Sequence, residues 1–139
     1  RTQPFHILAN TVKRLPVVPI IGDGKYLRQP VHVHDLNKLI KSLITRSVPS
    51  GTFEIGGPEQ LMFRDIVICL ADAADKVVIR MYLPIFLFSI ASKFVNFIDS
   101  ELVKAVVSDE YVNNETWQRY FSFQLTSFRT GVKDLVTNT

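Results

Sequence analysis

One short stretch of the sequence concentrates side chains that could bind a ligand: Arg28, followed by His32, His34 and Asp35. A guanidinium offers a planar fork of donors that matches two phosphate oxygens, and it stays charged at every relevant pH. Arg28 is therefore a candidate phosphate contact, with a solvated surface residue as the alternative. Alternate residues of an extended segment share a face, so His32 and His34 could suit a metal ion. A structural site needs four ligands and His6 is the sole other histidine, so we predict no metal site.

The elements that position this stretch follow from the apolar periodicity of the chain. It predicts helices over residues 4–15, 36–44 and 63–74, strands over 17–21, 52–55 and 76–83, a short extended piece at 31–33, and a helical tail over 85–98, 100–108 and 127–136. Gly22 and Gly24 supply the turn that precedes Arg28. Asp35 is the expected N-cap of the second helix. That helix is expected to bury one apolar stripe, formed by Leu36, Leu39, Ile40, Leu43 and Ile44.

Size and composition limit the classes of protein to which the chain can belong. Its 139 residues, 47% hydrophobic and 21% charged, predict a single globular domain over residues 1–139. The net charge of +3 comes from scattered basic residues without a polybasic stripe, so we expect no nucleic-acid partner. Pro84, Lys93 and Asn96 interrupt the most apolar stretch, residues 81–98, which argues against a membrane span. The lone Cys69 excludes an internal disulfide, and a cytoplasmic location is expected.

Two segments match one enzyme superfamily in order and spacing, namely Gly22-Asp-Gly-Lys-Tyr-Leu-Arg-Gln-Pro-Val-His-Val-His-Asp35 and Gly51-Thr-Phe-Glu-Ile-Gly-Gly-Pro58. Through them the chain resembles the C-terminal part of extended and atypical short-chain dehydrogenase/reductases, which include nucleotide-sugar epimerases and NmrA-like proteins. The implied fold class is α/β: a C-terminal fragment of a Rossmann-type extended short-chain dehydrogenase/reductase, with short strands alternating with helices and a helical C-terminal tail. The domain would be the substrate-side lobe, without the dinucleotide-binding half.

The residues that carry chemistry in this superfamily do not occur in the chain. A glycine-rich turn that opens a helix binds its dinucleotide, and a Tyr-x-x-x-Lys pair does its chemistry, and the sequence has neither. Gly22-x-Gly24 runs into Leu27 where a third glycine would be needed. We therefore expect no catalytic residue, no cofactor-binding residue and no bound NAD or NADP in this chain, and expect the cofactor in a full-length parent.

The resemblance implies roles for some residues that are present. Arg28 stands seven residues before Asp35, where the epimerases place an arginine that contacts the substrate diphosphate. Phe86 and Phe88 would form an apolar wall of the substrate cleft, with core packing as the alternative. His32 and Asp35 would shape a strand-to-helix corner, with Asp35 capping the helix. Met62 stands where the pattern puts a Ser or Thr, so a helix cap is lost.

Two functional interpretations from different classes follow. The first is the substrate-binding part of an NAD(P)-dependent epimerase, dehydratase or reductase that acts on a small molecule such as a nucleotide-sugar, inert in isolation. The second is a non-catalytic binding or assembly protein, like the atypical members that serve as accessory subunits of respiratory complex I. Arg28 favours the first, whereas the apolar helix 85–98 and the lost cap favour the second. A third interpretation is an artificial or proteolytic fragment whose present state reflects its isolation.

The first helix leads to an expectation about assembly. Phe5, Leu8, Val12 and Leu15 form an apolar stripe, which would have no partner once the dinucleotide half is missing. Exchange of helix 4–15 between two copies would cover that surface. We therefore expect the isolated chain to self-associate.

Overall fold

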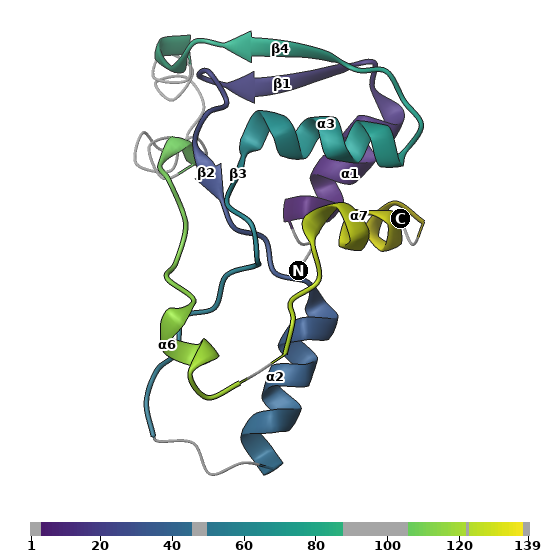
Figure 1. Ribbon diagram of the computed structural model, residues 1–139. Helices are drawn as coiled ribbons and strands as arrows, with labels where there is room; N and C mark the ends of the chain where they lie inside the picture. The colour runs from purple at the N-terminus through teal and green to yellow at the C-terminus, as the bar shows by residue number, and fades with distance from the viewer. Residues whose placement is uncertain (1–3, 46–49, 88–105, 122, 138–139) are drawn as a thin grey trace.

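A computed structural model of the chain describes residues 4–45, 50–87, 106–121 and 123–137. Within these ranges the chain alternates between helices and short strands, as expected for an α/β fold (Figure 1). The elements in order are α1 (Pro4–Arg14), β1 (Val17–Ile21), β2 (Leu27–Arg28), α2 (Val33–Thr45), β3 (Leu61–Met62), α3 (Phe63–Ala73), β4 (Ile79–Leu83), α6 (Glu115–Gln118) and α7 (Phe128–Thr137). The predicted helices 4–15, 63–74 and 127–136 and the predicted strand 17–21 are confirmed to within one residue at each end.

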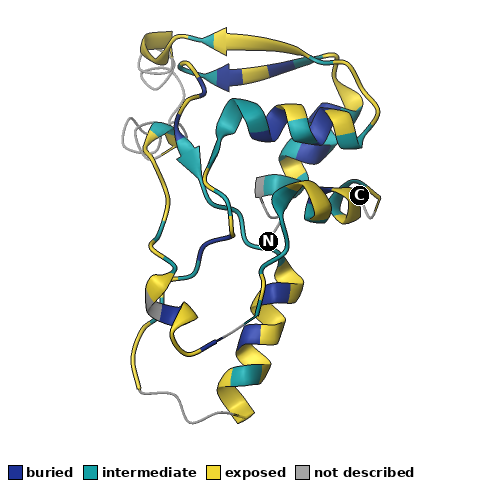
Figure 2. Ribbon diagram, in the orientation of Figure 1, coloured by how far each residue is buried: buried dark blue, intermediate teal, exposed yellow. Residues whose placement is uncertain are grey.

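The larger part of the molecule is built around β1 and β4. These strands pair in parallel, with Val17 opposite Ile79 and Ile21 opposite Leu83. Parallel neighbours need a long crossover, and here the crossover contains β2, α2, β3 and α3. The main core lies between this strand pair and the helices beneath it, as Figure 2 shows. It consists of Ala9, Val12, Val18, Ile20, Ile66, Val67, Leu70, Ala71 and Val132.

A second and smaller cluster lies at the other end of the molecule, beside α2 and α6 (Figure 1). Its buried residues are Leu39, Trp117 and Phe121, and the partly buried Phe53 and Ile55 pack against them. The indole Nε1 of Trp117 donates a hydrogen bond of 2.9 Å to a nearby side-chain amide oxygen. We call this group the Trp117 cluster.

The first helix packs within its own chain, which corrects one premise of the expected self-association. Ala9 and Val12 are each only 1% exposed, and Phe5 and Leu8 pack against the main core. Of the four predicted stripe residues, only Leu15 is exposed, at 51%. The apolar stripe of α1 therefore has partners in α3 and α7, and exchange of this helix is not needed to cover it. Self-association itself stays a prediction.

The second helix differs from its prediction in both its start and its buried face. It begins at Val33, so residues 31–33 form no strand, and the strand near Arg28 is β2, which pairs antiparallel with β3. Among the described residues α2 buries only Asp35 and Leu39. The other four residues of the expected stripe are 36% to 81% exposed: Leu36, Ile40, Leu43 and Ile44. The periodicity identified the helix correctly, but it could not show which elements are there to cover it.

The segment 52–55, predicted as a strand, is not a strand in the structure. Its neighbour would have to be another extended segment, and none of the described residues pairs with it. The predicted strand 76–83 is shorter, because β4 begins at Ile79. In the tail, residues 85–87 and 106–107 are helical. The remainder of the predicted helices 85–98 and 100–108 lies outside the described residues, and the short helix α6 was not predicted.

The start of α3 confirms that Met62 provides no side-chain cap. The turn before β2 supplies the missing acceptors instead, because the amide of Phe63 donates to the Tyr26 carbonyl and that of Arg64 to the Gly24 carbonyl, both at 3.0 Å. This turn depends on glycine. Gly24 has a φ of +66°, and a Cβ there would lie 2.8 Å from Ile20 Cγ2. Only a residue without a side chain fits that conformation at that distance.

Candidate functional site

Arg28 lies in β2, and its side chain is only 15% exposed, so it is not a solvated surface residue. Its guanidinium carbon sits 4.9 Å from the centre of the Tyr26 ring, a cation–π distance. The Nη1 atom donates to the carbonyls of Leu27 and Ser108, at 2.8 and 2.6 Å, and Nη2 donates to the Val106 carbonyl. Arg28 therefore fastens residues 106–108 to β2.

Glu110 places a negative charge beside the Arg28 guanidinium. Its carboxylate lies 3.6 Å from Arg28 Nε, and its side chain is 81% exposed. A guanidinium has five N–H donors, and Nη1 and Nη2 already use three of them on carbonyls. Glu110 faces the fourth. A phosphate that approached Arg28 would therefore compete with an exposed carboxylate for the same charge.

Gln29 and Asn114 hold the glycine pair that follows residue 55. Gln29 Nε2 donates to the Gly57 carbonyl at 2.8 Å, and its Oε1 accepts from the Val112 amide at 2.8 Å. Asn114 Oδ1 accepts from the Gly56 amide at 3.0 Å, while its Nδ2 donates to the carbonyls of Gly56 and Gly57. Both side-chain amides thus connect separate parts of the backbone. The sequence analysis did not identify either residue, because nothing in a single sequence distinguishes a connecting amide from an exposed one.

These connections allow an unusually close approach of two backbone segments. A Cβ at Gly57 would lie 1.8 Å from the Pro30 carbonyl oxygen, and the Gly57 amide donates to the Gln29 carbonyl at 3.2 Å. Gly56 is buried as well, and a Cβ there would lie 2.3 Å from the Gln29 side chain. The glycine pair is therefore needed for packing against residues 29 and 30.

A cavity of about 640 Å³ opens beside this junction. Its walls come from five separate parts of the chain: the first turn of α1, residues within 28–36, residues 55 and 56, residues 110–112, and residues within 126–135 that lead into and belong to α7. Arg28 and Gln29 lie on one wall, Tyr111 on another, and Thr126 and Phe128 on a third. Ligand pockets commonly have about 300 to 1,000 Å³ and mix apolar walls with a few polar groups. The cavity is thus of the right size and character for a small ligand.

Asp35 is a buried connector and not an N-cap, which corrects that prediction. It lies inside α2 and is 1% exposed. Its carboxylate accepts the Thr126 amide at 2.5 Å, the Thr126 hydroxyl at 3.1 Å and the Lys38 ammonium at 3.1 Å. Burial acts to raise the pKa of Asp35, but these hydrogen bonds outweigh it and hold that pKa below its ordinary value. Asp35 therefore ties α2 to the segment that leads into α7.

His32 performs the capping that was expected of Asp35. Its Nδ1 accepts the amide of His34 at 3.3 Å, the bond expected between an N-cap and the second helical residue. Its Nε2 lies 3.7 Å from a carboxylate oxygen of Asp134 on α7. Both ring nitrogens thus have partners, and His32 lies at the corner where α2 begins, although residues 31–33 form no strand. Among the described residues no group of three or more His, Cys, Asp or Glu side chains could hold a metal ion.

Phe86 and Cys69 do not line this cavity. Phe86 is 60% exposed, and Phe88 lies outside the described residues. Burial raises the pKa of the Cys69 thiol, which disfavours a nucleophilic thiolate. The described part of the chain contains no helix with the length and apolar character that a membrane crossing requires.

Comparison with solved structures gives the fold a context. RMD from Pseudomonas aeruginosa, solved with NADPH, matches 99% of this chain at a TM-score of 0.69 and 10% identity. UDP-glucuronic acid 4-epimerase from Bacillus cereus, solved with NAD, matches 98% at 0.69 and 16% identity. dTDP-glucose 4,6-dehydratase from Bacillus anthracis, solved with NAD, matches 94% at 0.68 and 16% identity. No family model and no curated protein matches the sequence.

The chain spans only about two fifths of the length of these structures, which is 41%, 39% and 37% in the same order. At these identities the likeness establishes the fold alone. The fold is α/β, and it matches that of a part of each of these structures.

Proposed function

We propose that the chain is the substrate-binding portion of an NAD(P)-dependent nucleotide-sugar epimerase/dehydratase-like oxidoreductase, and that it is inert in isolation. The observation that carries the proposal is the position of Arg28, a largely buried guanidinium on the wall of a cavity of about 640 Å³. The likeness of nearly the whole chain to an NADPH-bound protein and to an NAD-bound UDP-glucuronic acid 4-epimerase supports it. NAD or NADP would bind to the remainder of the parent protein, in the cytoplasm, with no nucleic-acid partner.

Arg28 would recognise the diphosphate of the substrate. A guanidinium stacked on Tyr26 is held at a fixed place, so little side-chain freedom is lost on binding. Val106, Ser108 and Glu110 now occupy most of its donors, and the ligand would displace Glu110 first, because that carboxylate is the most exposed of these partners. Phe86 stays in this proposal only as a residue that would border the substrate outside the cavity, and Phe88 stays as a predicted wall residue.

The test is calorimetric titration of UDP into the parent protein and its Arg28→Lys variant, with NAD saturating. The variant should bind UDP more weakly by roughly 1 to 3 kcal/mol, because an ammonium cannot replace a two-pronged contact. Its affinity for NAD should not change. An unchanged affinity for UDP would remove Arg28 from the substrate site.

The chain without the rest of the parent should bind neither NAD(H) nor NADP(H), because it lacks a glycine turn that opens a helix. Calorimetry with each cofactor checks this expectation. Saturable binding tighter than about 100 μM, roughly 5.5 kcal/mol, would contradict the proposal that the cofactor binds to the remainder of the parent protein.

The second candidate function is a non-catalytic binding or assembly protein. It is favoured by the exposed apolar residues of α2, since large exposed apolar patches mark interaction surfaces. It is also favoured by the internal use of the Arg28 donors, which hold the chain together whether or not a ligand binds. A parent protein that binds NAD but no sugar nucleotide would support this candidate.

A further inference from the structure

The strand β4 (Ile79–Leu83) is the outer strand of the sheet that it forms with β1 (Figure 1). Within the described ranges no other strand pairs with its outer edge. The first four of its five residues are exposed, and Figure 2 shows them on the outside of the molecule. The outer edge of a strand carries a row of backbone donors and acceptors on which another strand can pair.

The backbone bonds between the two strands show which groups of β4 point to this outer edge. The Ile79 amide donates to a carbonyl just before β1, and the Leu83 carbonyl accepts from an amide just after β1, both at 2.8 Å. Both residues therefore direct their backbone groups at β1. Because this direction alternates along a strand, Arg80 and Tyr82 direct their N–H and C=O groups at the outer edge.

The side chains of Arg80 and Tyr82 share one face of the sheet. These residues stand beside Val18 and Ile20 of β1, which are 1% and 0% exposed, so this is the face that the helices cover. At the edge of the sheet both residues are nevertheless exposed, Tyr82 at 45%. A strand that paired with β4 would therefore bring its own side chains against Arg80 and Tyr82.

The other three residues of β4 are apolar and lie on the opposite face of the sheet. They are Ile79, Met81 and Leu83, of which the first two are 65% and 45% exposed. A neighbouring strand with apolar side chains at the matching positions would cover part of this area. The outer edge of β4 thus presents a basic and aromatic row on one face and an apolar row on the other.

We propose that β4 is the surface through which two copies of this chain associate, by antiparallel pairing of their β4 strands about a two-fold axis at Met81. This axis places Arg80 of each copy opposite Tyr82 of the other. Since both residues point outward, each of these two pairs exchanges two backbone hydrogen bonds. The pairing joins two sheets of two strands into one of four. It also gives the expected self-association a surface that does not involve α1.

Arg80 favours a second copy as the partner. A charged residue in an edge strand normally opposes pairing, because most neighbouring strands leave the charge without a suitable partner. Here its neighbour is the ring of Tyr82, and a guanidinium is attracted to the face of such a ring. The chain already contains this kind of pair, since the Arg28 guanidinium carbon lies 4.9 Å from the centre of the Tyr26 ring. The β4 edge is therefore complementary to itself.

The neighbouring symmetric registers are less favourable. An axis at Arg80 would place two guanidinium groups directly opposite each other, and like charges at opposed positions destabilise a strand pair. An axis at Tyr82 would pair Arg80 with Pro84, which has no amide hydrogen to donate. The register about Met81 avoids both defects, and it also places Ile79 of each copy opposite Leu83 of the other.

Cysteine cross-linking in a chain that carries Cys69→Ser tests the surface and the register together. Met81→Cys should give a disulfide-linked dimer on oxidation, because the pairing brings the two copies of residue 81 to a Cα separation of about 4.5 Å. Ile79→Cys is the matched control, since the same pairing separates its two copies by about 14 Å along the strand. Met81→Cys should cross-link at least about 10-fold faster, although Ile79 is the more exposed residue. Equal rates, or a faster rate at position 79, would overturn the inference.

Sedimentation equilibrium of the unmodified chain measures the association itself. We expect a concentration-dependent rise from 15.8 kDa, the mass of one copy, to twice that mass. Arg80→Pro removes one outward amide from each copy and leaves the bonds to β1 in place, so its dimer should dissociate at least about 10-fold more readily. Circular dichroism checks that the variant is folded, and the cross-linking pair decides the question if it is not.

A chain that stays monomeric, or a dimer that Arg80→Pro does not weaken, would overturn the inference. The first outcome would leave the β4 edge to another partner, and the second would place the contact on another surface. Neither measurement involves a nucleotide, so their outcome is separate from that of the UDP titration.

Discussion

Among the residues that the structure describes, the main core holds nine buried ones, contributed by α1, β1, α3 and α7, whereas the Trp117 cluster holds three. The main core is covered on several sides by elements of the same chain. The Trp117 cluster borders on a helix whose apolar face is exposed and on residues 52–55, which pair with no other segment among the described residues. Buried apolar area is the main source of stability, so the two regions should differ in stability as well as in architecture. Residues of both regions line the cavity, among them Val132 of the main core and Ile55 beside the Trp117 cluster.

The largest effect should come from a deletion in the main core. Leu70 is 0% exposed at the centre of α3, so Leu70→Ala should lower the free energy of unfolding by about 3 to 5 kcal/mol. Urea unfolding followed by far-UV circular dichroism measures it. Ile68→Ala on the same helix, where the side chain is 37% exposed, is the control and should cost much less.

The sole tryptophan makes the comparison between the regions sharper. Trp117 is the only tryptophan in the sequence, so its fluorescence reports on the Trp117 cluster alone. In the chain 1–139 we expect its transition at a lower urea concentration than the transition in circular dichroism. Coincident transitions would mean that both regions unfold as one unit.

The next largest effect should come from Gly57, which packs against residues 29 and 30 between the two regions. Gly57→Ala would place a Cβ 1.8 Å from the Pro30 carbonyl oxygen, which forces the backbone apart. We expect a loss of about 3 kcal/mol, the size of an overpacking defect. Gly51→Ala is the matched control, because no atom lies within 4 Å of its Cβ position, and it should be neutral or slightly stabilising. Equal stabilities of the two variants would contradict the close contact.

The same contrast between regions explains what could be predicted from the sequence. Periodicity located α1, α3 and α7 because the partners of these helices belong to this chain. It failed for the 52–55 strand and for the α2 stripe, since a strand requires a ladder and a buried stripe requires a cover, and neither is a local property. Both of these failures lie in the region of α2 and the Trp117 cluster.

In the candidate site, a residue could be predicted from the sequence where its chemistry follows from its type alone. It could not be predicted where its role depends on contacts with residues far away in sequence. The type of Arg28 and its place after a glycine turn identified it as a candidate. Its partners at residues 106–110 come from a part of the chain far away in sequence. Asp35 was placed correctly at a corner, but its partner Thr126 is 91 residues away, so capping was the simpler and wrong expectation.

Asp35 connects the two regions, and its charge should matter in a pH-dependent way. Its pKa is lower in the folded chain than in the unfolded chain, so the carboxylate stabilises the fold above the unfolded pKa of about 3.9. That contribution is lost as the pH falls through the folded pKa. Asp35→Asn should therefore cost about 1 to 3 kcal/mol near neutral pH. The difference from wild type should shrink in acid.

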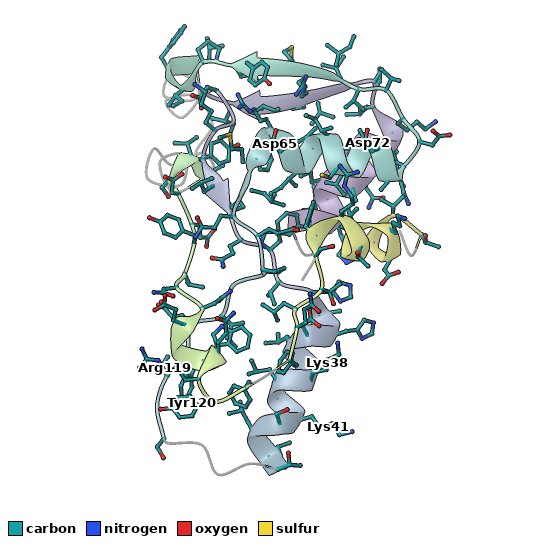
Figure 3. The ribbon with its side chains drawn as sticks, viewed as in Figure 1. Lys38, Lys41, Asp65, Asp72, Arg119 and Tyr120 are labelled. Atoms are coloured by element: carbon teal, nitrogen blue, oxygen red, sulfur yellow. The ribbon has the colours of Figure 1, made fainter. Side chains whose placement is uncertain are left out.

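Thermal unfolding of both proteins between neutral and strongly acid pH measures this difference. The control is Asp72→Asn, because Asp72 is exposed on α3 (Figure 3) and should shift stability little at any pH. A constant difference between Asp35→Asn and wild type across the pH range would mean that the carboxylate charge does not stabilise the connection.

The smallest effect should come from Glu110, at the mouth of the site. Its exposed carboxylate lies 3.6 Å from Arg28 Nε and would repel a diphosphate that approaches the same guanidinium. Exposed pairs of this kind contribute about 0 to 1 kcal/mol, so Glu110→Gln should leave stability nearly unchanged and tighten UDP binding to the parent protein about 2- to 5-fold. The gain should fade as salt is raised, since salt screens exposed charges. Glu115→Gln on α6 is the matched control and should change nothing. Weaker binding in Glu110→Gln would mean that Glu110 positions Arg28 for the ligand instead of competing with it.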